Sequence, residues 1–230
     1  GRMIEGLDAE VASDAAATEI SQNACITIHA ALDAPLRTLR GAALCSVMTE
    51  LLPTDYETLR RSFDELRYGR LPNYSLIGLG SLSEFDASRA PSGKATVQAW
   101  DYVPYQRADG LSWDQVKVDY AEKMMGHMGK FLKNMTHENV LGYHCDSPLD
   151  MERTSSSFVR GDLHGVAMPS YQLGAHRPTP ALVQYTVPKV GRLYLVGPFQ
   201  HPGGGVFGAG RAAAQKFCGD LGIDFDKLHG

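Results

Sequence analysis

A glycine-rich turn between an apolar run and an alanine-rich segment has the residue types and spacing best suited to chemistry. The run from Leu193 to Val196 is short and almost wholly apolar, which is typical of a parallel strand covered on both faces. The turn at 201–205 reads His-Pro-Gly-Gly-Gly, and its glycines let a ligand approach the backbone closely. The segment 206–218 favours a helix. The free amides and the dipole at its start would attract an anionic or electron-rich oxygen.

The residues alone do not say which ligand that would be. A glycine triplet also serves as a tight connection between a strand and a helix, and taken by itself it favours that interpretation.

The wider pattern resembles the C-terminal flavin-binding motif of phytoene-dehydrogenase-like FAD oxidoreductases. Tyr194-Leu195-Val196-Gly197 precedes the glycine turn, and Gly208 with an alanine-rich helix follows it. A second block, at 161–180, matches the family pattern in order: Gly161-Asp162-Leu163-His164-Gly165, then Gln172-Leu173, then Arg177-Pro178-Thr179-Pro180. The resemblance implies an α/β protein with FAD as its cofactor. It would combine an α+β substrate domain with the terminal strand, turn and helix of a Rossmann-like FAD domain.

The resemblance also implies site residues. Those predicted to bind the cofactor are Gly197, His201, Pro202, Gly203, Gly204, Gly205 and Val206. His201 is the best side-chain candidate to contact the flavin ring or the substrate, although a capping role fits it equally well, and Tyr171 is a weaker catalytic candidate. Gln172, His176 and Arg177 are weaker candidates for the substrate pocket, and Arg177 taken alone would be a surface cation.

One motif of the resembled family is missing from the start of this chain. Such proteins begin with a strand that carries GxGxxG, and no such motif lies near the start of this chain. The segment 1–17 reads alone as a weak hairpin or a frayed start, and beside the family it resembles a β-hairpin in the middle of a domain. We therefore expect an incomplete FAD-binding fold, with a substrate-domain-like region at 1–180 and the end of the FAD domain at 181–230. A second polypeptide or a preceding half with GxGxxG, or self-association, would cover the exposed sheet edge and apolar face.

Composition narrows the choice of partners. The chain has 230 residues, a net charge of −4 and 43% hydrophobic residues, which indicates a globular protein without an electrostatic case for nucleic acid or an anionic membrane. It has no apolar segment long enough to be an integral membrane span. Four scattered cysteines without a CxxC pair favour free thiols and a cytoplasmic setting. His137, His144 and Cys145 lack a fourth ligand at a recognisable spacing, so we expect no metal site.

Periodicity predicts the remaining elements. Strands are expected at 24–32, 94–103 and 140–143, with a strand-like start at 73–82. Helices are expected at 55–68 and 113–133, and a short turn into a helix at 147–153. The segment 40–48 could be helical or extended.

These features favour the C-terminal part or a subunit of a flavin-dependent oxidoreductase, which would desaturate or isomerise a small apolar organic substrate by hydride transfer to FAD. A non-catalytic subunit or binding module that keeps the fold without holding FAD by itself is the alternative. A nucleotide-binding protein that uses the glycine loop independently is a third, weakened by the missing acidic residue after a second strand.

Overall fold

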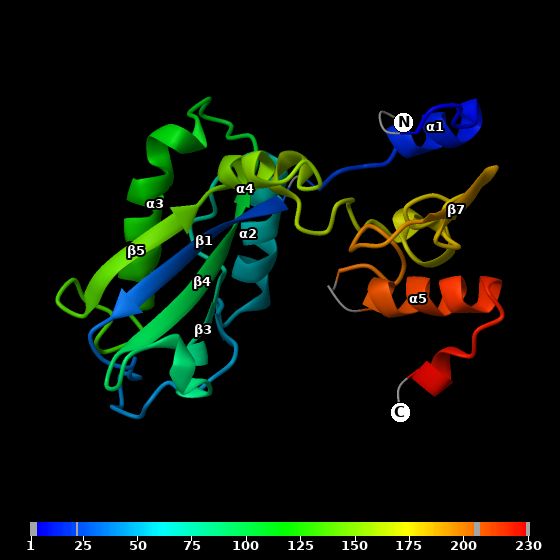
Figure 1. Cartoon of the computed structure of the whole chain (residues 1–230). Helices are drawn as coiled ribbons and strands as arrows, with labels where there is room; N and C mark the ends of the chain where they lie inside the picture. The colour runs from blue at the N-terminus through cyan, green and yellow to red at the C-terminus, as the bar shows by residue number, and fades with distance from the viewer. Residues whose placement is uncertain (1–3, 22, 205–207, 229–230) are drawn as a thin grey trace. The chain divides into compact units, whose positions relative to one another are not determined.

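The computed structural model describes residues 4–21, 23–204 and 208–228, and the chain divides into two compact units (Figure 1). The sheet unit is Gln22–Ser156, and the turn unit joins Gly1–Ser21 to Ser157–Gly230. Helices are mixed with antiparallel sheets, which confirms the expected α/β class. The division differs from the expected boundary after residue 180, because 157–180 groups with the rest of the C-terminal segment and with 1–21.

The sheet unit is built on a five-stranded antiparallel sheet in the order β2-β3-β4-β1-β5. The strands are β1 (Asn23–Leu32), β2 (Thr49–Leu51), β3 (Ile77–Gly80), β4 (Ala95–Pro104) and β5 (Val140–Asp146). The four strands expected from alternation are confirmed as β1, β3, β4 and β5. The undecided segment 40–48 forms neither a helix nor a named strand, and β2 follows it.

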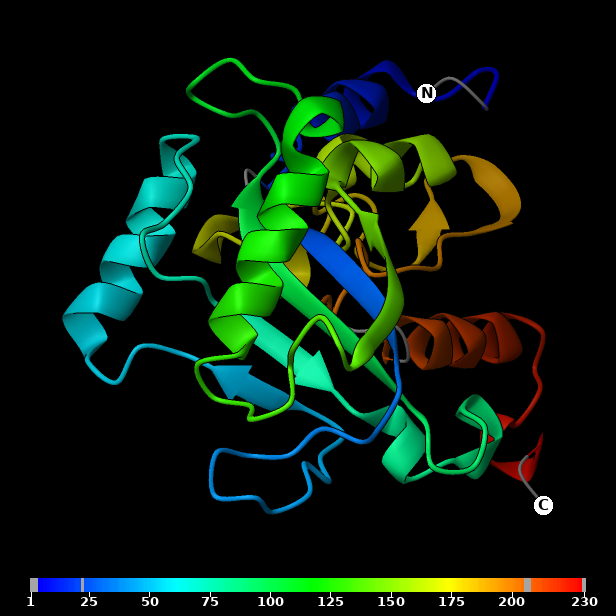
Figure 2. The same cartoon turned by 90° about the vertical axis from the view of Figure 1, so that its left-hand side faces the viewer.

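Helix α3 (Trp113–Met128) lies across one face of this sheet (Figures 1 and 2). Its predicted apolar stripe is confirmed as core, although the helix ends at Met128 rather than at residue 133. The residues of the stripe pack with inward-facing residues of β1 and β4. They include Tyr120, Ala121, Met124 and Met128 of α3, Ile26, Ile28 and Ala30 of β1, and Val97, Ala99 and Val103 of β4.

Helix α2 (Tyr56–Arg67) confirms the helix expected at 55–68, and Asp55 caps its first turn by accepting a hydrogen bond from Thr58 N. Single 3-10 turns complete the helical elements: Leu82–Glu84, Ala87–Arg89, Val159–Gly161, Ser170–Gln172, Gly174–His176 and Phe225–Leu228.

The two tryptophans both belong to the sheet unit. Trp113 is buried at the start of α3, where its indole N–H donates to the backbone carbonyl of Pro104 at 3.0 Å. Trp100 is on the opposite face of the sheet and lies against Gly78, where a Cβ would be only 2.2 Å from the indole ring. Glycine is therefore required at position 78 by close approach.

A buried carboxylate joins three parts of the sheet unit. Asp101 of β4 is fully buried and accepts hydrogen bonds from the Leu76 N–H and the Tyr120 hydroxyl, both at 2.8 Å. Burial raises the pKa of Asp101, while these hydrogen bonds oppose the rise. The carboxylate thus contributes to the core rather than to a surface site.

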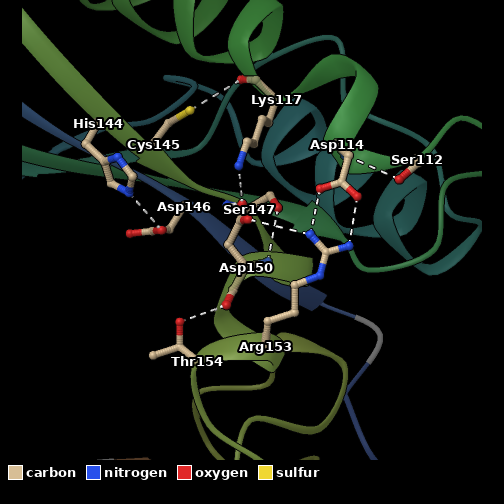
Figure 3. Close-up of polar contacts among 10 residues, drawn as sticks. All are labelled: Ser112, Asp114, Lys117, His144, Cys145, Asp146, Ser147, Asp150, Arg153 and Thr154. Atoms are coloured by element: carbon tan, nitrogen blue, oxygen red, sulfur yellow. Dashed lines mark hydrogen bonds and ion pairs between the residues drawn. The ribbon is translucent and has the colours of Figure 1, made fainter.

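Helix α4 (Pro148–Thr154) is connected to α3 by two ion pairs (Figure 3). Lys117 Nζ lies 2.8 Å from Asp150 Oδ2, and Arg153 makes two contacts of 2.7 and 2.8 Å with the Asp114 carboxylate. Ser147 caps α4, with its hydroxyl donating to Asp150 Oδ2 at 2.6 Å. Burial of Asp150 would raise its pKa, but the hydrogen bonds from Lys117 and Ser147 outweigh it and lower the pKa to about 2.

The turn unit has a small apolar core of its own. Helix α1 (Ala9–Ala16) packs Val11 against Leu182 and Val187, next to the two-stranded antiparallel hairpin of β6 (Thr186–Val187) and β7 (Val190–Tyr194). Helix α5 (Gly208–Asp220) buries Ala209, Ala213 and Cys218.

Two expectations for this unit are wrong. The N-terminal segment forms a helix instead of a hairpin, because Asp8 caps it through the Glu10 N–H at 3.0 Å and Val11 is buried. The run 193–196 does not form a parallel strand: among the described residues, β7 pairs only with β6, and Val196 is exposed. Leu193 and Leu195 instead serve the small core beside Val11.

In the parts of the chain that the structure describes, none of the helices combines the length and apolar character needed to cross a bilayer.

Asp150→Asn should destabilise the sheet unit at neutral pH and have little effect near pH 2. The folded pKa of about 2 lies below the ordinary value of 3.8, so this stabilisation is present above pH 3.8 and is lost as the pH falls through 2. The difference corresponds to about 2 kcal/mol. Urea unfolding of both proteins across this range measures it. Asp114→Asn, in an exposed ion pair, is the control and should cost less; an equal loss at pH 7 and pH 2 would contradict the assignment.

Candidate functional site

Arg177 lies inside the turn unit, not on its surface. Its side chain is fully buried, and its guanidinium donates to four backbone carbonyls: Ala167 at 2.9 Å, His164 at 3.2 Å, Val166 at 3.2 Å and Pro198 at 2.8 Å. Burial lowers the pKa of Arg177, and the nearby Asp162 opposes this. The residue therefore joins the 164–167 loop to the turn that carries the predicted flavin contacts.

The two described glycines of the turn have different surroundings. Gly203 (φ +80°) lies directly on Arg177, where a Cβ would be 2.5 Å from Nε and 3.0 Å from Cζ. Gly204 (φ +69°) has room: a Cβ would lie 3.6 Å from the sulfur of Met168 and 3.9 Å from Cδ2 of His164. Both positions need glycine for their backbone, but only at Gly204 would a Cβ fit at ordinary contact distance from its neighbours.

The predicted cofactor residues are only partly described. Gly205 and Val206 lie outside the described residues, and so does the expected helix start. His201 and Pro202 are exposed, and the backbone carbonyl of His201 accepts a hydrogen bond from the Tyr185 hydroxyl at 3.0 Å. Gly197 (φ +148°) sits against Phe199, which would be 2.7 Å from a Cβ there. Phe199 therefore fills the space left by a glycine.

Gln172 and Tyr171 both face Glu19. The Gln172 amide is buried, accepts from the Glu19 N–H at 3.0 Å, and donates to the carbonyls of Glu19 at 3.1 Å and Ala167 at 2.8 Å. The exposed Tyr171 donates its hydroxyl to the Glu19 carboxylate, which raises the pKa of the tyrosine. The structure thus gives Gln172 a role in holding the loop that Arg177 also holds, through the shared Ala167 carbonyl.

His176 is exposed and lines an open pocket of about 280 Å³ within the turn unit. The pocket lies between the C-terminal end of α1 and the segment 171–180. Its other lining residues are Asp14, Ala17, Thr18, Tyr171, Gln172, Pro178, Thr179 and Pro180. The lining does not include the glycine turn, so the described geometry does not bring His176 together with Gly204.

Asp162 and His164 form a pair that sequence reasoning did not single out. Asp162 is buried, and its carboxylate accepts from the His164 N–H at 2.8 Å and the Ser21 N–H at 3.0 Å. His164 Nδ1 lies 3.6 Å from Asp162 Oδ1. Burial would raise the pKa of Asp162, but the contacts with His164 and Ser21 outweigh it and lower the pKa. The Asp-x-His spacing within the GDLHG block is the sequence signal that could have found this pair.

Gln200 was also missed, and no sequence signal marks it. Its side chain is fully buried next to the glycine turn in sequence, and both polar atoms of its amide lack a hydrogen-bond partner among the described residues. Arg177 Nε is likewise without a partner in the described part of the chain. Unpaired buried polar groups are costly, so such groups are typical of positions that a ligand or water satisfies.

No protein-family model matches the chain. It is 36% identical over 166 residues to the rat protein named pyridine nucleotide-disulfide oxidoreductase domain-containing protein 2, an alignment that covers 71% of this chain and 28% of the rat protein. The mouse protein of the same name is 34% identical over 196 residues, covering 84% of this chain and 33% of the mouse protein. The chain spans about a third of the length of these curated relatives. The similarity is to proteins whose name refers to an oxidoreductase domain, and it does not by itself identify a cofactor or a substrate.

Arg177→Met should destabilise the turn unit by at least about 3 kcal/mol, because it leaves buried carbonyls without their charged donor. Arg177→Lys should also destabilise it, since an ammonium group cannot reproduce the planar fork. Faster hydrogen–deuterium exchange of residues 157–204 measures the loss. The exposed Arg192→Met is the control, and equal exchange in the two methionine variants would contradict a central role for Arg177.

Gly203→Ala should destabilise the turn unit more than Gly204→Ala. Both variants place a side chain at positive φ, at a cost of about 1–2 kcal/mol. Only the first presses on Arg177, which adds roughly 1–3 kcal/mol of overpacking. Chemical denaturation followed by circular dichroism compares the two, and a larger loss at position 204 would show that the close contact at Gly203 is not the deciding factor.

Proposed function

We propose that this chain contributes the flavin-contacting turn of an FAD-dependent oxidoreductase of the phytoene-dehydrogenase-like type. The observation that carries the proposal is Gly204, held at positive φ within van der Waals distance of Met168 and His164, while its neighbour Gly203 is fixed on Arg177. The oxidoreductase-domain relatives support the class, and the resembled HPGGG motif supports the cofactor.

The residues present fit a flavin. Gly204 leaves room that a Cβ would partly fill, and the Gln200 amide is a buried donor and acceptor without a partner in the described residues. In this proposal Gly197, Gly203 and Gly204 shape the turn, and His201 and Pro202 lie at its exposed side. Gly205 and Val206 remain proposed cofactor contacts on the strength of the motif alone. Arg177 positions the turn through its contacts with the Pro198 carbonyl and Gly203, and it does not contact the ligand.

The bound flavin would accept a hydride from the substrate. The chain's own residues would orient the reacting groups and exclude water, since no metal or covalent nucleophile is required for that chemistry. Met168 and the apolar lining it offers beside Gly204 favour an apolar organic substrate, and desaturation or isomerisation is the proposed reaction. A partner polypeptide or further segment with GxGxxG would hold the ADP half of FAD.

Gly204→Val should lower flavin content without a matching loss of stability, because its side chain would fill the space next to Met168. The affinity for FAD should fall at least about tenfold, which corresponds to about 1.4 kcal/mol. Flavin absorption of the complete purified protein, titrated with FAD, measures it.

The matched control is Gly174→Val, since Gly174 also has positive φ (+56°) but meets nothing within 4 Å of its Cβ position. It should carry the same backbone strain and keep its flavin. Complete protein without flavin absorption after incubation with FAD would reject the proposal and favour the non-catalytic binding module.

A further inference from the structure

The ring of His164 lies between the buried carboxylate of Asp162 and Gly204. Its Nδ1 lies 3.6 Å from Asp162 Oδ1, and its Cδ2 lies 3.9 Å from the Cβ position of Gly204. Nε2 adjoins Cδ2 in the ring, so of the two ring nitrogens it is the one that is not directed at Asp162. The side chain of His164 is 43% exposed, whereas that of Asp162 is 1% exposed.

The backbone of His164 is fixed on both sides. Its N–H donates to Asp162 Oδ1 at 2.8 Å, and its carbonyl accepts from Arg177 Nη2 at 3.2 Å. Asp162 and Arg177 are the charged groups in contact with His164 from the loop and from beneath it. The ring thus lies within ion-pair distance of the Asp162 carboxylate, and its side chain is partly exposed. A histidine beside a buried carboxylate is suited to proton transfer because the carboxylate balances the imidazolium charge.

We propose that His164 is the proton acceptor of the reaction at this turn and that Asp162 is its positioning residue. The inference rests on the proposed function. In a two-electron oxidation the substrate loses a hydride to the oxidised flavin and a proton to His164 Nε2. The electron pair of the bond that releases the proton becomes the new double bond, and the imidazolium later returns its proton to water.

His164 suits this role better than His201. His201 is exposed, and its described hydrogen bond is made by its backbone carbonyl, with no carboxylate contact among the described residues. Of these two histidines, only His164 has its ring close to a carboxylate in the described part of the chain.

The first test uses diethyl pyrocarbonate, which modifies unprotonated imidazole nitrogens, on the complete protein at neutral pH. Peptide mass spectrometry follows each histidine with and without FAD. His164 should react in the free protein, and FAD at about 100 times its Kd should slow that reaction at least tenfold, since only about 1% of sites remain empty. His176, in the separate pocket, is the control and should keep its rate.

The outcomes separate the two proposals. If FAD binds but leaves the His164 rate unchanged, or if His164 does not react in the free protein, the proton-acceptor inference is overturned while the proposed function stands. If FAD does not bind at all, the proposed function fails and the inference fails with it.

The second test concerns the pair itself. In His164→Gln, which changes a half-exposed side chain, carboxyl NMR should show the pKa of Asp162 rising towards its ordinary value. Asp162→Asn, which removes the carboxylate and keeps the shape of the side chain, should change the rate of His164 modification, and Asp162→Glu should restore the original rate. An unmoved Asp162 titration in His164→Gln, at unchanged folding, would remove Asp162 as the positioning residue even if the asparagine variant does not fold.

Discussion

The geometry of the turn unit depends on one buried guanidinium. Arg177 satisfies carbonyls of residues 164, 166 and 167 and the carbonyl of Pro198 at once. These segments have little regular secondary structure, so helix or sheet hydrogen bonds do not satisfy their backbone carbonyls. The planar guanidinium of arginine, with five N–H donors, can supply the missing hydrogen bonds. The position of Gly204 beside His164 follows from this single group, because the same nitrogens hold both segments.

The two units are stabilised by different means. The sheet unit relies on ladder hydrogen bonds between strands and on a continuous apolar core, while the turn unit relies on side chains bonded to backbone: Arg177, Asp162 and Gln172. Buried polar networks of the second kind specify a conformation closely but lose much when one member is removed. A ligand that binds the turn unit would therefore change its stability more visibly than that of the sheet unit.

Sequence patterns predicted the sheet unit well because each signal there is local. Alternation in β4 and helical spacing in α3 correspond directly to the buried faces. In the turn unit the apolar run at Leu193 predicted a parallel strand. This was wrong because apolarity alone does not fix the pairing direction, whereas the structure places the start of the run in an antiparallel hairpin beside Val11. Arg177 taken alone was interpreted as a surface cation. Its hydrogen-bond acceptors are backbone carbonyls, and these cannot be recognised from the types of the surrounding residues. The Gly203–Gly204 turn was recognised from its motif. Only the structure shows that Gly203 lies against Arg177 whereas Gly204 lies near Met168 and His164.

The placement of the two tryptophans has a practical consequence. Trp100 against Gly78 and Trp113 at the start of α3 both belong to the sheet unit, and the chain has no other tryptophan. Tryptophan fluorescence during unfolding therefore reports on the sheet unit. It would not detect a separate unfolding transition of the turn unit. Tyrosine emission does not report that transition separately, because only Tyr171, Tyr185 and Tyr194 of the ten tyrosines belong to the turn unit. Unfolding of that half of the molecule is therefore better followed by hydrogen–deuterium exchange than by intrinsic fluorescence.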